Sequence, residues 1–319
     1  MSVIGIILCV LVGIYLAITC VIFGLFWYEK GINPCPELKQ PKRGFFTVVR
    51  LWLCFTGAEL MRLYSIVHWA IRQKKTPNQF QTAKNLGRPV IVLVHGLYDR
   101  PSSWLVAVHY LEKAGYRVVT FGYKSLKGTH ETVGKAFDDF MSLAGVSFPE
   151  QKFLLIGHSL GGLIVRNWLA QPGNEEKASG LVTIGTPHKG SRLALFAPGS
   201  LSRCLMPNSA FIQSLEAAPA LTIPCIAVVS CEDEMVLPGA NLLPPEGWTI
   251  VEVNRGGHLA QIFCPCTIKR IIKEIAVFSG IDKVVVVPEQ AAPQEEAAPE
   301  NTEETKAEAP AKAPTKGKK

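Results

Sequence analysis

The chain has 319 residues, of which 48% are hydrophobic and 18% charged, and its formal net charge is +7. A chain of this length can bury one large core, so we expect one domain with flanking segments. The nine cysteines are scattered and form neither the paired spacings of a zinc site nor a dense disulfide framework. We therefore expect no metal and no cofactor, and we interpret Cys264 and Cys266 as separate thiols near a helix start.

The positive charge is concentrated in one part of the chain. Between Lys30 and Lys75 there are nine Lys or Arg residues against two acids, Glu37 and Glu59, which gives a local net charge of +7. Because this segment follows an apolar run, anionic lipid headgroups are a better partner than nucleic acid, at about 1 kcal/mol per basic residue. We predict contact with a bilayer surface and no nucleic-acid partner.

The N-terminal run from Val3 to Trp27 contains 25 residues and no charged side chain. It is long enough to cross the ~30 Å hydrocarbon core of a bilayer, and Trp27 and Tyr28 fall where an interfacial aromatic belt is expected. A cleavable signal peptide is disfavoured because no Lys or Arg precedes the run and no small-residue cleavage site follows it. We predict that residues 1–28 form a single-pass membrane anchor.

The expected orientation of this anchor follows from its flanking charges. The excess of Lys and Arg begins at Lys30, on the C-terminal side of the anchor, and such segments favour the cytoplasm. Free cysteines agree with that compartment. Together the two tendencies place the rest of the chain on the cytoplasmic side.

Residues 29–87 form a basic juxtamembrane segment that contains a second apolar stretch, from Phe45 to Ile71. Arg50, Glu59 and Arg62 interrupt this stretch, and charges at such spacing are costly inside a bilayer. We expect an amphipathic helix that lies in the membrane interface or packs on the domain that follows.

Between residues 88 and 287, short β-rich runs alternate with helical patterns. This order predicts an α/β fold with a mostly parallel sheet and helices on both faces. After Val287 the composition changes to Pro, Ala, Glu and Lys, so residues 288–319 are expected to be a disordered tail. The predicted strands are 89–95, 117–123, 152–157, 180–185, 223–230 and 249–253, and the predicted helices are 102–114, 131–143, 160–170 and 260–278.

The clearest chemical motif is KFLLIGHSLGG, residues 152–162, in which a buried strand runs directly into a helix. Gly157-His158-Ser159-Leu160-Gly161 at the junction is a G-x-S-x-G nucleophile elbow. Such an elbow is a tight, strained turn, and side chains at Gly157 and Gly161 would clash with neighbouring backbone. We predict Ser159 as the nucleophile, with the helix N-terminus favouring negative charge on the reacting oxygen.

A second loop is expected beside the nucleophile. The first predicted strand ends in His95-Gly96-Leu97, and in enzymes with such an elbow this loop supplies one N–H group to an oxyanion hole. The residue after the nucleophile supplies the other. Leu97 and Leu160 are therefore the candidate backbone donors, and His95 is expected to shape the loop rather than to act as a base.

Two histidines downstream of Ser159 compete for the role of general base. His188, in TPHKG, follows the very next strand and leaves no room for an intervening acid. His258, in NRGGH, follows the last predicted strand and opens the final helix. Because the order in this kind of triad is Ser, acid, His, we predict His258.

Three neighbouring carboxylates compete for the role of the acid. Glu232, Asp233 and Glu234 all follow the strand that ends near Ser230. We choose Asp233 because its Asp-x-x-Val pattern with a following Pro238 matches the acid turn of many hydrolases. Its expected role is to orient the imidazole and stabilise the imidazolium.

Five stretches resemble the lipase and esterase branch of the α/β-hydrolase superfamily. They are HGL at 95–97, GHSLGG at 157–162, TIGTPHKGS at 183–191, the turn at Asp233 and GGH at 256–258. The second and third together are similar to bacterial triacylglycerol lipases and the GPI inositol-deacylase group, as is the run LMPNSAF at 205–211. The resemblance covers about 190 residues, excludes the anchor and the tail, and carries no calcium-site pattern. It implies an α/β-hydrolase fold and ester hydrolysis.

The segment at 188–220 bears on the substrate. It separates two predicted strands and is rich in Leu and Phe, which suits an acyl-chain pocket or a lid. A helix that packs on the sheet without touching substrate is the alternative. With the anchor and the basic segment, this composition points to a lipid ester presented at a bilayer, such as an acylglycerol, a phospholipid or a lipoprotein.

Two other functions stay open at this point. The same site would be an acyltransferase if an alcohol or thiol, rather than water, released the acyl-enzyme. Some domains of this fold instead act as non-catalytic scaffolds, but here every triad member is available in the right order. The pattern does not predict an oligomeric state.

Overall fold

The computed structural model describes residues 2–40, 44–72, 88–253 and 256–278. All of them fall in one compact unit, Met1–Val284. The predicted tail, residues 288–319, lies outside the described residues.

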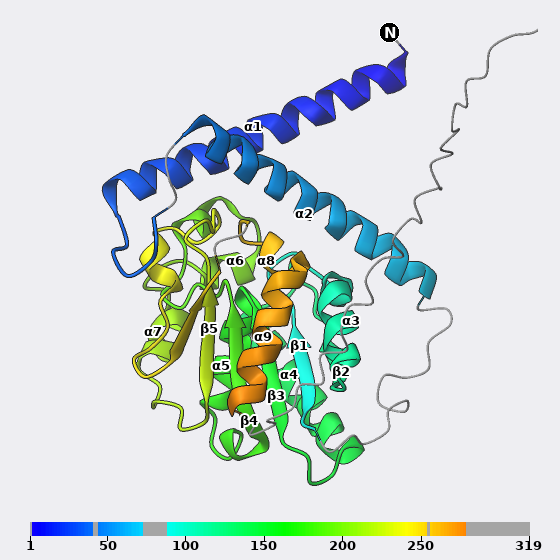
Figure 1. The fold of residues 1–319 in the computed structure, drawn as a ribbon, viewed down its shortest axis with the longest axis vertical. Helices are drawn as coiled ribbons and strands as arrows, with labels where there is room; N and C mark the ends of the chain where they lie inside the picture. Colours follow the sequence, from blue (N-terminus) through cyan, green and yellow to red (C-terminus); the bar gives the residue numbers. More distant parts are fainter. Residues whose placement is uncertain (1, 41–43, 73–87, 254–255, 279–319) are drawn as a thin grey trace, which may run out of the picture. The chain divides into compact units, whose positions relative to one another are not determined.

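A parallel sheet of six strands forms the centre of the domain, in the order β2-β1-β3-β4-β5-β6 (Figure 1). The strands read as continuous apolar runs such as VIVLV because both faces of the sheet are covered. Each of the six predicted strands is present, with its ends within two residues of the predicted ones. The bounds are β1 Val90–Val94, β2 Arg117–Phe121, β3 Phe153–His158, β4 Ala178–Ile184, β5 Cys225–Val229 and β6 Thr249–Glu252.

Helices cover both faces of this sheet. On one face α4 (His130–Ser147) and α5 (Leu160–Leu169) bury Phe137 and Leu163 against the strands. On the other face α3 (Leu105–Lys113) lies beside α9 (Pro265–Phe278), as Figure 1 shows. The predicted α/β fold with a covered parallel sheet is therefore confirmed. Three short 3-10 turns, η1 Pro101–Trp104, η2 Glu175–Lys177 and η4 Gly239–Leu242, complete the connections.

The last predicted helix is divided in two. α8 (Ala260–Phe263) ends at Cys264, and α9 begins with Pro265. Proline has no backbone N–H to continue a helix but fits the first position of a new one. This division brings the Cα atoms of Cys264 and Cys266 to 5.4 Å, and the two residues form a disulfide.

The interpretation of Cys264 and Cys266 as separate thiols was therefore wrong. Other described cysteines, such as Cys9, Cys20 and Cys35, lie outside this disulfide. Disulfides persist mainly in oxidising compartments. The cysteines consequently no longer support the cytoplasmic side, and the orientation expected from the sequence rests on Lys and Arg alone.

Two long helices precede the domain. α1 (Val3–Ile32) is the one helix in the described part of the chain that is long and apolar enough to cross a membrane. Its N-terminal part exposes large apolar side chains, for example Val3 at 73% and Leu11 at 60%. Near its C-terminal end Phe26 and Glu29 are buried, so this end of α1 belongs to the packed part of the protein.

The second apolar stretch is a single helix, α2 (Phe45–Arg72), which packs on the domain beside η1 and α8. Ala58 joins the core cluster that contains Trp104, and the Ser65 hydroxyl lies 3.5 Å from that of Ser102. The alternative in which this helix packs on the domain is therefore the one observed. Its outward face is nevertheless apolar, since Phe46 and Val67 are exposed.

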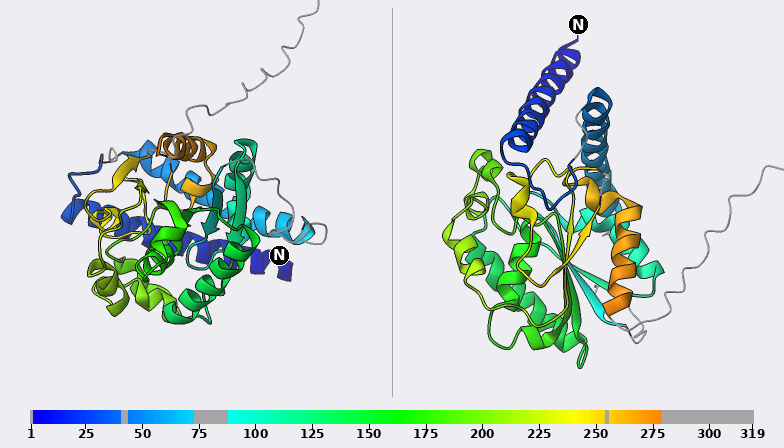
Figure 2. Two further views of the ribbon diagram at one scale, coloured as in Figure 1. Left: turned by 90° about the horizontal axis from the view of Figure 1, so that it is seen from below. Right: turned by 60° about the vertical axis from the view of Figure 1, so that its left-hand side comes forward.

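In the right-hand view of Figure 2, α1 and α2 both lie at the same end of the domain. Specific contacts join α1 to α2 and both helices to the domain. The Tyr15 hydroxyl lies 2.8 Å from the Thr56 hydroxyl, and the rings of Phe23 and Phe55 meet edge to face. At the end of α1, Glu29 accepts a hydrogen bond of 2.8 Å from Arg192 of the domain. These contacts make the two helices part of the same packed structure as the sheet.

The apolar segment at 188–220 forms η3 (Arg192–Phe196), α6 (Ser200–Cys204) and α7 (Ala210–Glu216). Leu201, Phe211 and Ile212 are buried in the core cluster that also holds α4 and α5. These side chains therefore support the sheet, as in the second of the two sequence interpretations.

Candidate active site

The backbone at Ser159 has the geometry of a strained elbow. β3 ends at His158, α5 begins at Leu160, and Ser159 between them has φ 53° and ψ −124°. A Cβ atom added to Gly157 would lie 2.6 Å from the carbonyl carbon of Gly161, and one added to Gly161 would lie 2.6 Å from the His95 carbonyl oxygen. The glycines are thus required by crowding, and Ser159 is held in a conformation that non-glycine residues rarely adopt.

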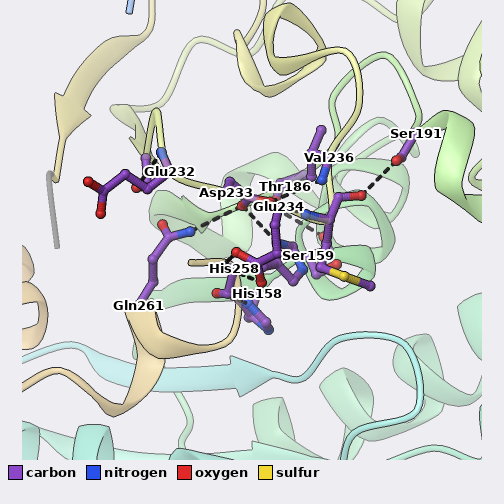
Figure 3. A network of polar contacts seen from close by, with 12 residues as sticks. His158, Ser159, Thr186, Ser191, Glu232, Asp233, Glu234, Val236, His258 and Gln261 are labelled. Carbon is purple, nitrogen blue, oxygen red and sulfur yellow. Dashed lines mark hydrogen bonds and ion pairs between the residues drawn. The ribbon is translucent and has the colours of Figure 1, made fainter. Parts of the chain in front are cut away.

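The acid and base chosen from the sequence are in contact. His258 donates from Nδ1 to Asp233 Oδ2 over 2.7 Å, and Gln261 donates to the same oxygen over 3.1 Å (Figure 3). The other carboxylate oxygen of Asp233 accepts the backbone N–H groups of Met235 and Val236, both at 3.0 Å. Four donors thus hold the buried carboxylate of Asp233 in one orientation.

This pairing also sets the protonation of His258. Burial alone would lower the pKa of His258, but the charge and hydrogen bond of Asp233 outweigh it and raise the pKa above its usual value. With Nδ1 donating to Asp233, Nε2 is the atom left to accept a proton from a nucleophile. The arrangement is that of a general base oriented by an acid.

The two glutamates beside Asp233 have separate partners. Glu234 is buried, and both its oxygens accept the backbone N–H of His258, at 3.0 and 3.2 Å. Glu232 accepts the N–H of Gly256 at 3.1 Å and forms an ion pair with Arg50 of α2. All three neighbouring carboxylates therefore hold the turn that carries His258, and Asp233 is the one that contacts its ring.

Two further histidines surround the site without contacting Asp233. His95 is buried, stacks on Tyr123 at 4.2 Å, and accepts the Tyr123 N–H at Nε2, while burial lowers its pKa to about 4. His158 donates to the backbone carbonyl of His258 over 3.2 Å, and burial followed by the charge of His258 holds its pKa well below the usual range. Both imidazoles are neutral supports for their loops.

The candidate oxyanion donors lie close to Ser159 in the backbone. A Cβ atom added to Gly96 would lie 3.0 Å from Cβ of Ser159, so the loop that carries Leu97 approaches the nucleophile directly. Leu160 is the first residue of α5, and N–H groups in the first turn of a helix have no acceptor within that helix. The two N–H groups remain proposed as the oxyanion hole.

Ser159, His258 and Leu97 share one cavity of about 620 Å³. Its outer wall comes from α1 and α2, through residues such as Ile18 and Leu60. No residue of the 188–220 segment, all of which is described, lines it. The apolar wall of this cavity comes from the N-terminal helices, whereas Phe211 and Ile212 of the 188–220 segment are buried in the core and Phe196 is exposed.

A second cavity, of about 430 Å³, lies elsewhere in the domain and contains Arg166, His188 and Trp248. His188 is buried there, with its ring nitrogens 3.0 Å from Arg166 and 3.2 Å from the Thr183 hydroxyl. It does not line the cavity that holds Ser159. No group of His, Cys, Asp or Glu in the described residues is arranged to hold a metal ion.

Comparison with known proteins supports the fold seen in the structure. A family model described as the alpha/beta hydrolase fold matches residues 89–204, which include β1, the elbow and α5. Residues 89–204 match this family, and the domain has the α/β-hydrolase fold. The superfamily inferred from the five sequence stretches is therefore confirmed. No curated protein matches the sequence.

Solved structures with this α/β-hydrolase fold include a lipase of Bacillus licheniformis in its mature form, which is 18% identical, has a TM-score of 0.54 and aligns over 60% of this chain and 94% of its own. Its propeptide form is 19% identical, with a TM-score of 0.52 over 61% and 51%. A monoacylglycerol lipase of Paleococcus ferrophilus is 19% identical, with a TM-score of 0.47 over 59% and 94%. At these identities the first two show the shared fold.

Sequence reasoning on this α/β-hydrolase missed several supporting residues. Gln261 shares Oδ2 of Asp233 with His258, and the Thr186 hydroxyl donates to the carbonyl oxygen of Ser159 over 3.1 Å. Thr186 lies in the ThrPro motif already singled out, so its place after β4 was a usable signal. No sequence signal pointed to Gln261, because its role depends on how α8 folds back on the turn that carries Asp233.

Proposed function

We propose that the protein is a membrane-anchored serine hydrolase that cleaves carboxylic esters of lipids. The observation that carries this proposal is the hydrogen-bonded pair of Asp233 and His258 in the same cavity as Ser159, which stands on a strained elbow. The fold supports hydrolase chemistry in general, and this constellation supports acyl transfer through a serine.

The steps follow from the hydrogen bonds described above. Ser159 Oγ attacks the ester carbonyl carbon while His258 Nε2 takes its proton, and Asp233 stabilises the resulting imidazolium. The N–H groups of Leu97 and Leu160 hold the oxyanion. His258 then gives the proton to the departing alkoxide, and a water molecule, deprotonated by the same imidazole, releases the acid from the acyl-enzyme.

Two features support a lipid as substrate. α1 has the length and composition of a membrane anchor, and the cavity wall above Ser159 is largely apolar. Among the basic residues of the juxtamembrane segment, Arg50 and Arg62 pair with glutamates of the protein, and those at 42, 43, 74 and 75 lie outside the described residues. The other basic residues of the segment favour an anionic bilayer surface. A substrate delivered from the bilayer agrees with both features.

The test uses the full chain in detergent micelles with p-nitrophenyl esters and a fluorophosphonate probe that labels activated serines. We expect hydrolysis and labelling at Ser159, both lost in Ser159→Ala and both retained in Ser142→Ala, an exposed serine on α4. Labelling with acyl transfer to an added alcohol in preference to water would make the protein an acyltransferase. A folded protein that neither hydrolyses esters nor reacts with the probe would refute the enzyme and favour a scaffold.

A further inference from the structure

The outer wall of the cavity is built by the helices that precede the family domain. Four residues of α1 contribute to it, Tyr15, Ile18, Thr19 and Ile22. Their spacing of three and four places them on one face of the helix. The family model begins only at residue 89, so this wall belongs to the chain's own N-terminal extension.

α2 supplies the facing side of the same wall. Phe55, Thr56, Leu60 and Leu63 line the cavity and recur at helical spacing. The two helices are joined beside the cavity, since Thr19 accepts a hydrogen bond of 3.3 Å from Trp52. The wall is therefore a fixed surface, and it is lined by mainly apolar side chains from two directions.

The cavity is polar at its inner end and apolar further out. Ser159, His258 and Asp99 line the cavity from the domain, and α2 adds the ion pair of Glu59 and Arg62 among its apolar lining residues. An occupant that satisfies both ends must carry a polar, reactive group at Ser159 and a long apolar chain between the helices. At about 620 Å³ the cavity falls within the range of small-molecule sites, roughly 300–1,000 Å³.

The outer surfaces of the two helices indicate from which side the apolar chain of the ligand enters the cavity. Ile18 of α1 and Leu60 of α2 line the cavity yet are 54% and 62% exposed, and neighbouring apolar residues such as Val21 and Leu53 are exposed beside them. Exposed apolar surface of this extent marks a membrane contact. The cavity wall and the proposed membrane-facing surface are therefore continuous.

We propose that α1 and α2 form an acyl-chain site through which long-chain esters enter from the bilayer. This inference rests on the proposed function, because the chain is placed by an ester carbonyl at Ser159. It adds a substrate class, a bilayer-resident ester whose acyl chain lies between the two helices, and it gives the anchor a role in substrate selection.

The test narrows the cavity by substituting tryptophan at lining positions that are exposed enough to accept a large side chain. In the full chain reconstituted into phosphatidylcholine vesicles, Ile18→Trp and Leu60→Trp are compared with Val21→Trp and Leu53→Trp, which change equally exposed residues of the same helices that do not line the cavity. Kinetics are measured on p-nitrophenyl esters of four to sixteen carbons. We expect kcat/KM on the longest esters to fall roughly tenfold or more in the lining variants only, with the four-carbon ester unchanged.

A second measurement separates this inference from the proposed function. Ser159→Ala protein in the same vesicles is irradiated with a photoreactive long-chain ester, and the labelled peptides are identified by mass spectrometry. Labels on the lining face of α1 and α2 support the site even if hydrolysis is absent, which would overturn the proposed function alone. Equal kinetics in lining and control variants, or labels spread over all faces of α1, would overturn the acyl-chain site.

Discussion

Glu234 makes the stability of the protein depend on pH in a direction opposite to that of most carboxylates. Burial, followed by the charge of Asp233, raises the pKa of Glu234 to about 8 from an ordinary value of 4.5. Between these values the folded chain keeps a proton that the unfolded chain releases. Stability therefore falls as pH rises through this range.

The magnitude follows from the size of the shift. Each pH unit between the two pKa values changes the free energy of unfolding by about 1.4 kcal/mol, so Glu234 removes about 4 kcal/mol between pH 5 and pH 8. His258 acts in the same direction, because its raised pKa gives a contribution that is full at low pH and lost as pH rises. Glu234→Gln removes the first effect and leaves Asp233, the larger cause of the raised pKa of His258, in place. It also retains an oxygen for the His258 N–H.

The assay is urea unfolding of the full chain in a fixed detergent, followed by tryptophan fluorescence at about pH 5 and pH 9. Relative to the unaltered protein, we expect Glu234→Gln to change little at the lower pH and to be more stable by a few kcal/mol at the higher one. Glu246→Gln, at an exposed loop position, serves as control. A stability difference between Glu234→Gln and the unaltered protein that is the same at both pH values would refute the reasoning.

Two other substitutions test the elbow and the acid. Asp233→Asn should reduce kcat on p-nitrophenyl esters by about 10⁴, because an amide cannot hold the imidazole in the required tautomer; a loss of less than about tenfold would remove Asp233 from the site. Gly161→Ala should lower the free energy of unfolding by about 3 kcal/mol or more, since its Cβ would lie 2.6 Å from a backbone carbonyl oxygen. Gly145→Ala in α4, with nothing within 4 Å of the added Cβ, should instead stabilise by about 0.5–1 kcal/mol in the same thermal and urea unfolding measurements. Equal effects of the two alanines would contradict the crowding argument.

Local patterns were sufficient for the sheet and the elbow. Runs such as VIVLV at Val90–Val94 predict both a strand and its burial. The glycines around Ser159 indicate that backbone segments approach closely there. The acid and the base could be ordered along the chain because each follows a strand of a parallel sheet, and such strands end at one edge. These features depend on neighbours in sequence or on one general rule of topology.

What could not be predicted depends on contacts between distant segments. Nothing in the local sequence of Arg50 indicates that it pairs with Glu232, 182 positions away. The apolar content of the 188–220 segment was compatible with a lid or with core packing, and only the burial of Phe211 and its neighbours distinguishes them. The Cys264–Cys266 bond likewise required the division of the helix at Pro265.

The ion pair between Arg50 and Glu232 bears on how much of the chain makes up the working enzyme. Glu232 uses one oxygen to hold the N–H of Gly256, two residues before His258, while its partner Arg50 belongs to α2. Cutting the chain after residue 87 to obtain a soluble catalytic fragment would leave the buried carboxylate of Glu232 without Arg50. It would also expose Trp104 and open the site to water. Helices α1 and α2 are thus part of the folded unit and do not act only as a membrane tether. A sample prepared for purification or inhibition should therefore include both helices.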